Sequence, residues 1–209
     1  YKGFLNHDGK ERFNSTYDPE KWKRATQASK DLIDAAHAAG HKLHYEYNDD
    51  GTIDPFLSCA NVFFRKTSEG NNEILFARPD SKHEEWYKHA TPRGCDGFGG
   101  LGVTQGLVDA FFMENGLSPI LGYKADGSPI INEASGYSET GFATEPEIRN
   151  TKWEIMRDHP DAVDGQITLP NTYNMYSNRE PRFYVSVVYN GQWYWSEKRA
   201  TRFMSGEPD

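Results

Sequence analysis

The chain contains 209 residues, of which 36% are hydrophobic and 26% are charged, and its formal net charge is −8. This composition excludes a disordered tail, and no apolar run approaches the roughly 18 to 20 residues that a transmembrane helix requires. An acidic chain repels polyanions, so nucleic acid and anionic lipid are poor candidate partners, whereas neutral polysaccharides carry no such penalty.

The strongest helical pattern lies at residues 19–39. Asp18 suits the N-cap, Pro19 suits the first helical position, and Gly40 suits the residue just past the end. Apolar and small residues recur at helical spacing on one face, namely Trp22, Ala25, Ser29, Leu32, Ile33 and Ala36. Because small residues let another helix approach closely, we expect this helix to belong to a stack of helix pairs.

Two further helices are predicted between residues 55 and 114. The first lies near residues 55–66, after a polar turn, and leads into a loop at 68–72. Residues 73–77 fit a short strand or an extended segment. The second helix runs from about 105 to 114, with Thr104 as its N-cap. Its predicted buried side chains are Leu107, Val108, Phe111 and Phe112.

The second half of the chain carries one more helix signal and one hairpin signal. Thr144-Glu145-Pro146-Glu147 has the form of a capping box and predicts a helix that continues to about Arg157. The β-rich residues 183–189 precede Asn190-Gly191, a dipeptide favoured in tight turns. We therefore expect a β-hairpin over residues 183–200.

The expected fold class is mainly α, with long irregular loops and one short β-hairpin. Residues 19–90 form the predicted helical part, and residues 91–209 form a loop-rich part. Its longest loops are predicted at 117–144 and 158–178, and loops of this length are uncommon unless they carry function. The chain begins at Tyr1, without an initiator Met or a targeting signal, so we expect it to be an internal fragment of a longer protein.

Two motifs suggest ligands that the surrounding sequence does not support. Gly97 to Gly102 matches a dinucleotide-binding glycine pattern, but its lead-in at 91–96 is turn-like and no strand precedes it. Residues 48–54 imitate part of a calcium loop, but Leu57 stands where a bidentate Glu is required. A polar turn is the favoured interpretation, with a structural calcium ion as the alternative. No other cofactor is expected.

The remaining chemistry-bearing residues give no defined site. His37, His41 and His44 are clustered, but no carboxylate stands at metalloprotease spacing, which favours solvated histidines over zinc. Cys59 and Cys95 permit either one disulfide or two free thiols. A hydrolase acting on carbohydrate needs two carboxyls about 5 to 10 Å apart across a cleft, and the sequence places no pair in this way.

Two longer segments resemble the signature stretches of the SusD/RagB family. The first, residues 102–116, contains Thr104-Gln105 and Leu107-Val108-Asp109-Ala110-Phe111, with Val103 and Gly106 in place of the family's Pro and Glu. The second, residues 176–191, contains Asn178-Arg179-Glu180-Pro181-Arg182-Phe183, with Glu180 in place of Asp, followed by Tyr189-Asn190-Gly191. Trp22 to Ala25 and Asn72 to Phe76 also resemble family segments. The resemblance therefore spans about residues 20–195.

The resemblance implies a SusD-like fold with tetratricopeptide-type helix pairs, and makes residues 1–209 part of a single domain. It implies a lipoprotein on the outer surface of Bacteroidetes, whose lipid anchor lies outside this chain. Its implied partners are a polysaccharide or oligosaccharide and a SusC-like TonB-dependent transporter. Glycan capture without catalysis is the expected function, and the alternatives are a carbohydrate-active hydrolase or a non-glycan scaffold of the transporter complex.

In this family, exposed aromatic rings stack on sugar faces while polar neighbours bind hydroxyl groups. By this resemblance the candidate rings are Tyr123, Tyr137 and Trp153, with Trp86 as a more distant candidate. Asn132 and Arg149 are the candidate polar partners. For Trp153 the alternative is a place in the core beside the predicted third helix.

Overall fold

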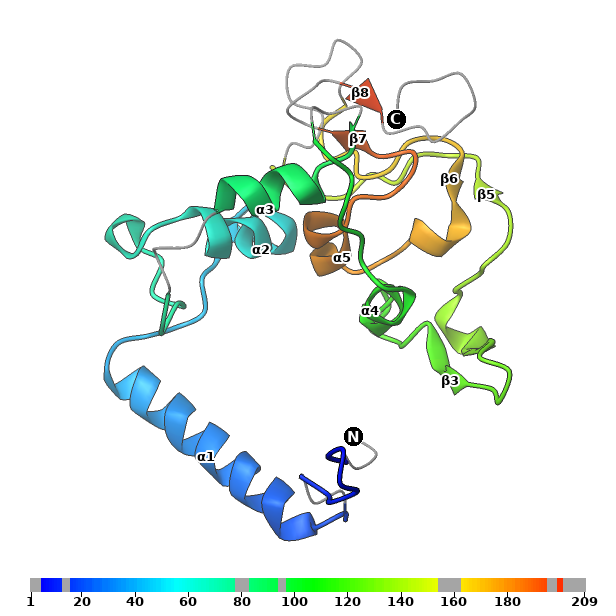
Figure 1. The fold of residues 1–209 in the computed structure, drawn as a ribbon. Coiled ribbons are helices and arrows are strands. Elements are labelled where there is room, and N and C mark those ends of the chain that lie inside the picture. Colours follow the sequence, from blue (N-terminus) through cyan, green and yellow to red (C-terminus); the bar gives the residue numbers. More distant parts are fainter. Residues whose placement is uncertain are drawn as a thin grey trace. The chain divides into compact units, whose positions relative to one another are not determined.

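A computed structural model describes residues 5–12, 16–77, 83–93, 97–153, 163–194 and 199–200, of which residues 193–194 and 199–200 are described by their backbone only (Figure 1). The chain divides into two compact units, residues 1–43 and 44–209, which are described separately. Across the described segments, no helix combines the length and the apolar character needed to span a membrane.

The first unit contains helix α1, Pro19–Ala38, which confirms the helix predicted at 19–39. The Asp18 side chain accepts a hydrogen bond from the Glu20 amide at 3.0 Å, and Gly40 takes a left-handed conformation with φ of 90° after the last turn. No side chain of α1 is buried, and Trp22 is 66% exposed. Pairing of α1 with a second helix therefore stays a prediction.

Helix α2, Pro55–Phe64, is the first helix of the second unit and confirms the helix predicted near 55–66. Asp54, which is fully buried, caps it by accepting hydrogen bonds from the amides of Phe56 and Leu57 at 3.1 and 3.0 Å. Strand β1, Glu46–Tyr47, pairs with β2, Ile53–Asp54. The Asp50 side chain accepts two hydrogen bonds from Thr52 within the intervening turn, as expected for a polar turn.

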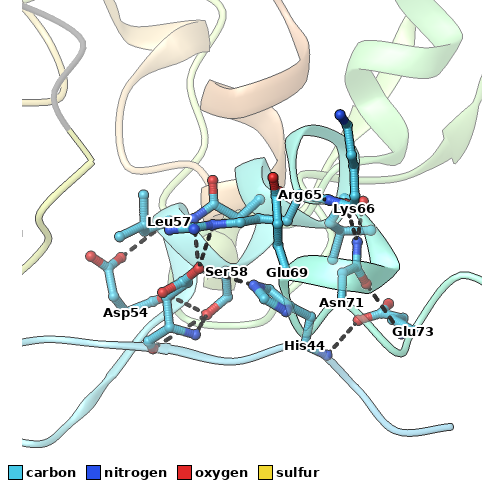
Figure 2. A network of polar contacts seen from close by, with 12 residues as sticks. His44, Asp54, Leu57, Ser58, Arg65, Lys66, Glu69, Asn71 and Glu73 are labelled. Carbon is cyan, nitrogen blue, oxygen red and sulfur yellow. Dashed lines mark hydrogen bonds and ion pairs between the residues drawn. The ribbon is translucent and has the colours of Figure 1, made fainter.

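A polar network holds the other end of α2 (Figure 2). Asn71 is fully buried, and its amide donates to the carbonyls of Val62 and Arg65 at 2.9 and 3.0 Å. These bonds satisfy carbonyls that the helix end would otherwise leave unpaired. After the 3-10 helix η1, Thr67–Glu69, the Glu73 carboxylate accepts a hydrogen bond from the His44 amide at 2.8 Å. Residues 73–77 form no strand.

Helix α3, His83–Ala90, is closed by the glycine-rich loop that follows it. The Phe98 amide donates to the Lys88 carbonyl at 2.6 Å, and the amides of Gly100 and Leu101 both donate to the His89 carbonyl at 2.9 Å. A phosphate cradle needs amides that are free to bind an anion. Because these amides already bind the end of α3, the loop is a helix cap and not a dinucleotide site.

Helix α4 runs from Gln105 to Ala110, with Thr104 as its cap, and is shorter than the predicted 105–114. It ends early because residues 112–114 pair with residues 178–180. The backbone amide of Glu114 donates to the Asn178 carbonyl at 2.8 Å, and the backbone amide of Glu180 donates to the Phe112 carbonyl at 3.0 Å. Of the four predicted buried residues Val108 is buried and Phe111 is half-buried, whereas Leu107 and Phe112 are exposed.

The predicted loop at 117–144 contains regular structure. Strand β3, Ile120–Tyr123, pairs antiparallel with β4, Pro129–Ile131, and the 3-10 helix η3, Glu133–Ser135, follows. Met113, Ile120 and Tyr137 form a small buried cluster beneath this hairpin, with Ile131 and Met175 packed against it.

The predicted helix from Thr144 is absent over residues 144–153, and the rest of that prediction lies outside the described residues. The segment is extended because it pairs with residues 165–173. Strand β5, Phe142–Ala143, pairs with β6, Thr172–Tyr173, and the Arg149 amide donates to the Gly165 carbonyl at 2.8 Å. Hydrogen bonds to a distant segment of the same chain therefore override the capping-box signal at Thr144.

The predicted strand at 183–189 is wrong for its first half, because Pro181–Ser186 form helix α5. Pro181 occupies the first helical turn, where its missing N–H is no loss. A hairpin of β7, Trp193–Tyr194, and β8, Arg199–Ala200, does follow, but Asn190-Gly191 precedes it instead of forming its turn. The hairpin predicted over 183–200 is therefore shifted towards its C-terminal end.

Helices α2 and α5 lie side by side in Figure 1 and pack against each other around the main core. Its buried members are Phe56, Val108, Ile167, Phe183, Tyr184, Val187 and Tyr189. The described chain is mainly helical, with four short antiparallel strand pairs, which confirms the mainly α expectation at that level. Tetratricopeptide-type pairing stays a prediction.

Candidate functional site

Arg179 joins the segments around residues 108–113 and 179–184. It is fully buried, and its Nη2 donates to the carbonyls of Val108 and Phe111, the latter at 3.1 Å. The guanidinium carbon lies 5.0 Å from the ring centre of Phe183 and 5.4 Å from that of Tyr137. The positive charge is therefore held by helix-end carbonyls and aromatic faces instead of a carboxylate.

Two glutamates add contacts to the two segments that Arg179 joins, and we call the joined segments the frame. Glu180 accepts the Phe112 amide at 2.9 Å and pairs with Arg182 at 2.6 Å. Glu147 accepts the Asn178 amide at 2.9 Å and the Tyr184 hydroxyl at 2.7 Å. Each carboxylate thus receives a backbone amide from the other side of the frame, which fixes α4 and α5 relative to the loops between them.

Tyr123 lies beside α4 and forms the first part of a candidate binding surface. Its hydroxyl donates to Oδ2 of Asp109 at 2.5 Å, while Oδ1 of Asp109 accepts the Gln105 amide at 2.8 Å. The Tyr123 side chain is half exposed. The hydrogen bond to Asp109 raises the pKa of Tyr123, so the hydroxyl stays protonated and the ring is held in one orientation.

A second pair of rings lies on β5 and β6. Phe142 and Tyr173 have ring centres 5.4 Å apart, and Phe142 is 64% exposed. The Tyr173 hydroxyl donates to the Glu139 carbonyl, and the Glu139 carboxylate accepts the Tyr137 hydroxyl at 3.2 Å. An exposed ring is therefore supported by a second ring whose hydroxyl is fixed.

These two parts adjoin each other. Gln105 of α4 approaches the sulfur of Met175 at 3.8 Å, and Met175 lies in the 3-10 helix η4, Asn174–Tyr176, directly after β6. The charge of Glu139 also contributes, after Asp109, to the raised pKa of Tyr123. We call this region the Tyr123 surface. Its residues are Gln105, Asp109, Tyr123, Glu139, Phe142 and Tyr173.

The Tyr123 surface combines exposed aromatic faces with fixed carboxylate and amide groups. Apolar ring faces with polar neighbours suit ligands that carry both C–H faces and hydroxyl groups. Within the described residues, no group of three or more His, Cys, Asp or Glu side chains is placed to hold a metal ion. Asp54, the last acidic residue of the calcium-like segment, is already bonded to Thr151 and to the Lys152 amide, both at 2.7 Å.

A sequence model of the SusD family matches residues 60–206, which is more than half of the chain and includes both segments joined by Arg179. The chain belongs to the SusD family. A search of curated proteins finds no match. The SusD family suggests glycan binding at the cell surface, and the signature stretches of this SusD-family chain form the frame that carries the Tyr123 surface.

Of the ring residues predicted from sequence, Tyr123 is part of this surface. Tyr137 lies outside this surface, because its side chain is 4% exposed and packs with Met113 and Ile120. Burial, with the nearby Glu139 charge, also raises its pKa. Trp153 stacks on Phe56 with ring centres 5.8 Å apart and packs against the main core.

The other three predicted site residues, Asn132, Arg149 and Trp86, lie outside the Tyr123 surface. Asn132 donates to the Ser118 carbonyl at 2.8 Å and supports the β3–β4 hairpin. Arg149 pairs with Glu114 and Glu147, so its guanidinium belongs to the frame. Trp86 lies on α3 and is 68% exposed.

Sequence reasoning missed Gln105, Asp109, Phe142 and Tyr173 as site residues. Gln105 and Asp109 lie one helical turn apart within the first signature stretch, so their shared face was a usable signal. Phe142 and Tyr173 gave none, because each lies in a strand of two residues whose partner is about 30 positions away.

Proposed function

We propose that this chain binds an oligosaccharide at the cell surface through the Tyr123 surface. The observation that carries the proposal is the half-exposed ring of Tyr123, whose hydroxyl is fixed by a carboxylate that α4 positions. A sugar ring presents C–H groups to such a face, and a ring already held in place loses little conformational entropy on binding.

Polar groups around the rings support the same proposal. Gln105 and Tyr123 both donate to Asp109, and the Glu139 carbonyl accepts the hydroxyl of Tyr173, the ring that lies beside Phe142. Amide and carboxylate oxygens accept hydrogen bonds from sugar hydroxyls, which gives the orientation that stacking alone does not. The proposed site thus needs one sugar ring on Tyr123 and a neighbouring unit near Phe142.

Binding without hydrolysis is part of the proposal. A glycosidase needs one carboxylic acid free to protonate the leaving oxygen and a second carboxylate across the scissile bond. Asp109 is buried, and both of its oxygens already accept hydrogen bonds, from Gln105 and Tyr123. The hydrolase alternative predicts release of reducing sugar from a bound polysaccharide, and we expect none.

Delivery is the remaining part of the proposal and rests on family membership. We expect the protein to act on the outer membrane, held by a lipid anchor, and to pass its ligand to a SusC-like TonB-dependent transporter. Capture of the transporter by the tagged protein from solubilised outer membranes, identified by its own sequence, would test this part.

The binding test is native affinity electrophoresis against plant, host and microbial polysaccharides, followed by calorimetry with oligosaccharides of the class that retards the protein. Tyr123→Ala should weaken binding about tenfold, because one stacked ring is worth roughly 1 to 2 kcal/mol. Phe142→Ala should weaken it similarly. Tyr123→Phe keeps the ring and should retain most of the affinity.

Tyr17→Ala is the matched control, because Tyr17 is 75% exposed and lies outside the Tyr123 surface. All variants are checked by thermal melting. Equal binding by Tyr123→Ala and the wild type would remove Tyr123 from the site. No retardation of the folded wild-type protein by any polysaccharide would favour the scaffold alternative.

A further inference from the structure

A pocket of about 500 Å3 lies between the glycine-rich loop after α3 and the segment after α5. Leu101 and Val188 line it with apolar side chains that are about half exposed, and Gly99 and Gly102 line it with backbone. Arg93 is the one charged side chain among the described residues of this lining. None of these residues belongs to the Tyr123 surface.

The Arg93 side chain is held by the loop but is not neutralised by it. Its Nε donates to the Phe98 carbonyl at 3.4 Å. Its Cγ would lie 3.6 Å from a Cβ placed on Gly99, which is ordinary van der Waals contact, so the arginine stem runs alongside that part of the loop. Across the described parts of the chain, no carboxylate pairs with Arg93, in contrast to Arg65, Arg149 and Arg182.

This combination has a specific chemical complement. A guanidinium with free Nη donors binds a planar carboxylate through two parallel hydrogen bonds. The apolar walls at Leu101 and Val188 suit the C–H face of a sugar ring. A pyranose that carries a carboxylate satisfies both features, whereas a neutral hexose would offer the exposed guanidinium of Arg93 no charged partner.

The geometry points to a second carbohydrate subsite in this pocket, which takes an acidic sugar unit, a uronic acid, with its carboxylate on Arg93. The inference rests on the proposed glycan-binding function and narrows its substrate class. It also reconciles an acidic ligand with the net charge of −8, because a single carboxylate paired with Arg93 meets mostly screened repulsion from the more distant acidic residues.

The test uses the full chain and small probes, so that it does not depend on the polysaccharide backbone. Methyl β-glucuronide, its carboxyl methyl ester and methyl β-glucoside are titrated separately while NMR chemical shifts are followed. The glucuronide should bind about tenfold more tightly than the ester, since a charge-assisted hydrogen bond is lost on esterification. Arg93→Gln should abolish that preference, and Arg93→Lys should retain part of it.

Arg12→Gln is the control, because Arg12 is an exposed arginine elsewhere and removes the same charge from the chain. It should keep the full preference for the glucuronide. Equal binding of acid and ester, no binding of the glucuronide at tens of millimolar, or an unchanged preference in Arg93→Gln would each overturn the inference. Tighter binding of a 6-sulfated glucoside than of the glucuronide would overturn the assignment to a carboxylate.

The two proposals fail separately. Tyr123→Ala should leave glucuronide binding unchanged while weakening the oligosaccharide. Loss of the acid preference in Arg93→Gln, with Tyr123→Ala behaving as the wild type, would support this subsite and refute the Tyr123 site. The reverse result would support the Tyr123 site alone.

Discussion

Arg179 is buried, and no carboxylate among the described residues forms an ion pair with it. Carbonyls at the end of α4 accept from its guanidinium, and the rings of Tyr137 and Phe183 lie against its faces. An isolated buried charge would be strongly destabilising, so these contacts must remain intact in the folded chain. A side chain in this position is a structural link between segments and not a ligand contact.

The role of Arg179 can be measured with a conservative change. Arg179→Lys keeps the charge but cannot reach both carbonyls in one plane, so it should lower the free energy of unfolding by about 3 kcal/mol. Urea denaturation followed by circular dichroism gives the value. Arg182→Lys is the control, because Arg182 is exposed and pairs with Glu180, and it should change stability by less than about 1 kcal/mol.

The exposure of an aromatic side chain was predictable from the sequence for Tyr123 but not for Tyr137. Tyr123 precedes a turn, and it is exposed as expected. Tyr137 has the same side chain in a similarly polar segment, yet it closes the small cluster under the β3–β4 hairpin. Exposure of an aromatic residue in a loop depends on contacts with distant residues such as Met113, and local sequence does not contain them.

At the scale of elements, caps were the reliable signals. Asp18 and Thr104 each accept a hydrogen bond at the start of the helix predicted from them. Such contacts involve residues two or three positions apart, so the local sequence specifies them fully. The predicted helix after Thr144 and the predicted strand at 183–189 failed because pairing with residues 165–173 and packing against α2 decided them.

The loop that closes α3 gives a prediction at this scale. A Cβ on Gly97 would lie 2.1 Å from the Thr91 carbonyl oxygen, too close for any real side chain. Gly97→Ala should therefore displace the loop and lower the free energy of unfolding by about 2 kcal/mol or more. The melting temperature should fall accordingly.

Gly102→Ala is the matched control in the same loop, because a Cβ there meets no atom within 4 Å. It should leave the melting temperature within a few degrees of the wild type, or raise it slightly through reduced freedom of the unfolded chain. Equal effects of the two substitutions would mean that the close approach at Gly97 does not hold in solution.

At the scale of the whole molecule, the sequence predicted the fold class but not how the segments pair with one another. The mainly α class followed from the sequence. The strand pairs, most of them with two-residue strands, did not, because two residues cannot display an alternation of polar and apolar side chains. The division at residue 43 was likewise not predicted.

The net charge of −8 predicts how the chain should respond to salt. Binding of a neutral oligosaccharide releases no condensed counterions, so its Kd should change less than about twofold between 50 and 500 mM NaCl. Calorimetry at both salt concentrations measures this. A steep weakening with salt would mean that the ligand binds through charge and would contradict stacking as the main contribution.

The contact between Arg179 and Val108 also sets the order in which the chain can be completed during translation. The two residues are 71 positions apart, and the six-residue α4 is too short to persist alone. At typical elongation rates the guanidinium is synthesised roughly 4 to 14 seconds after the carbonyl that it binds. During that interval the first signature stretch is without its partner, and nascent chains stalled before residue 179 should expose it to chaperones and proteases.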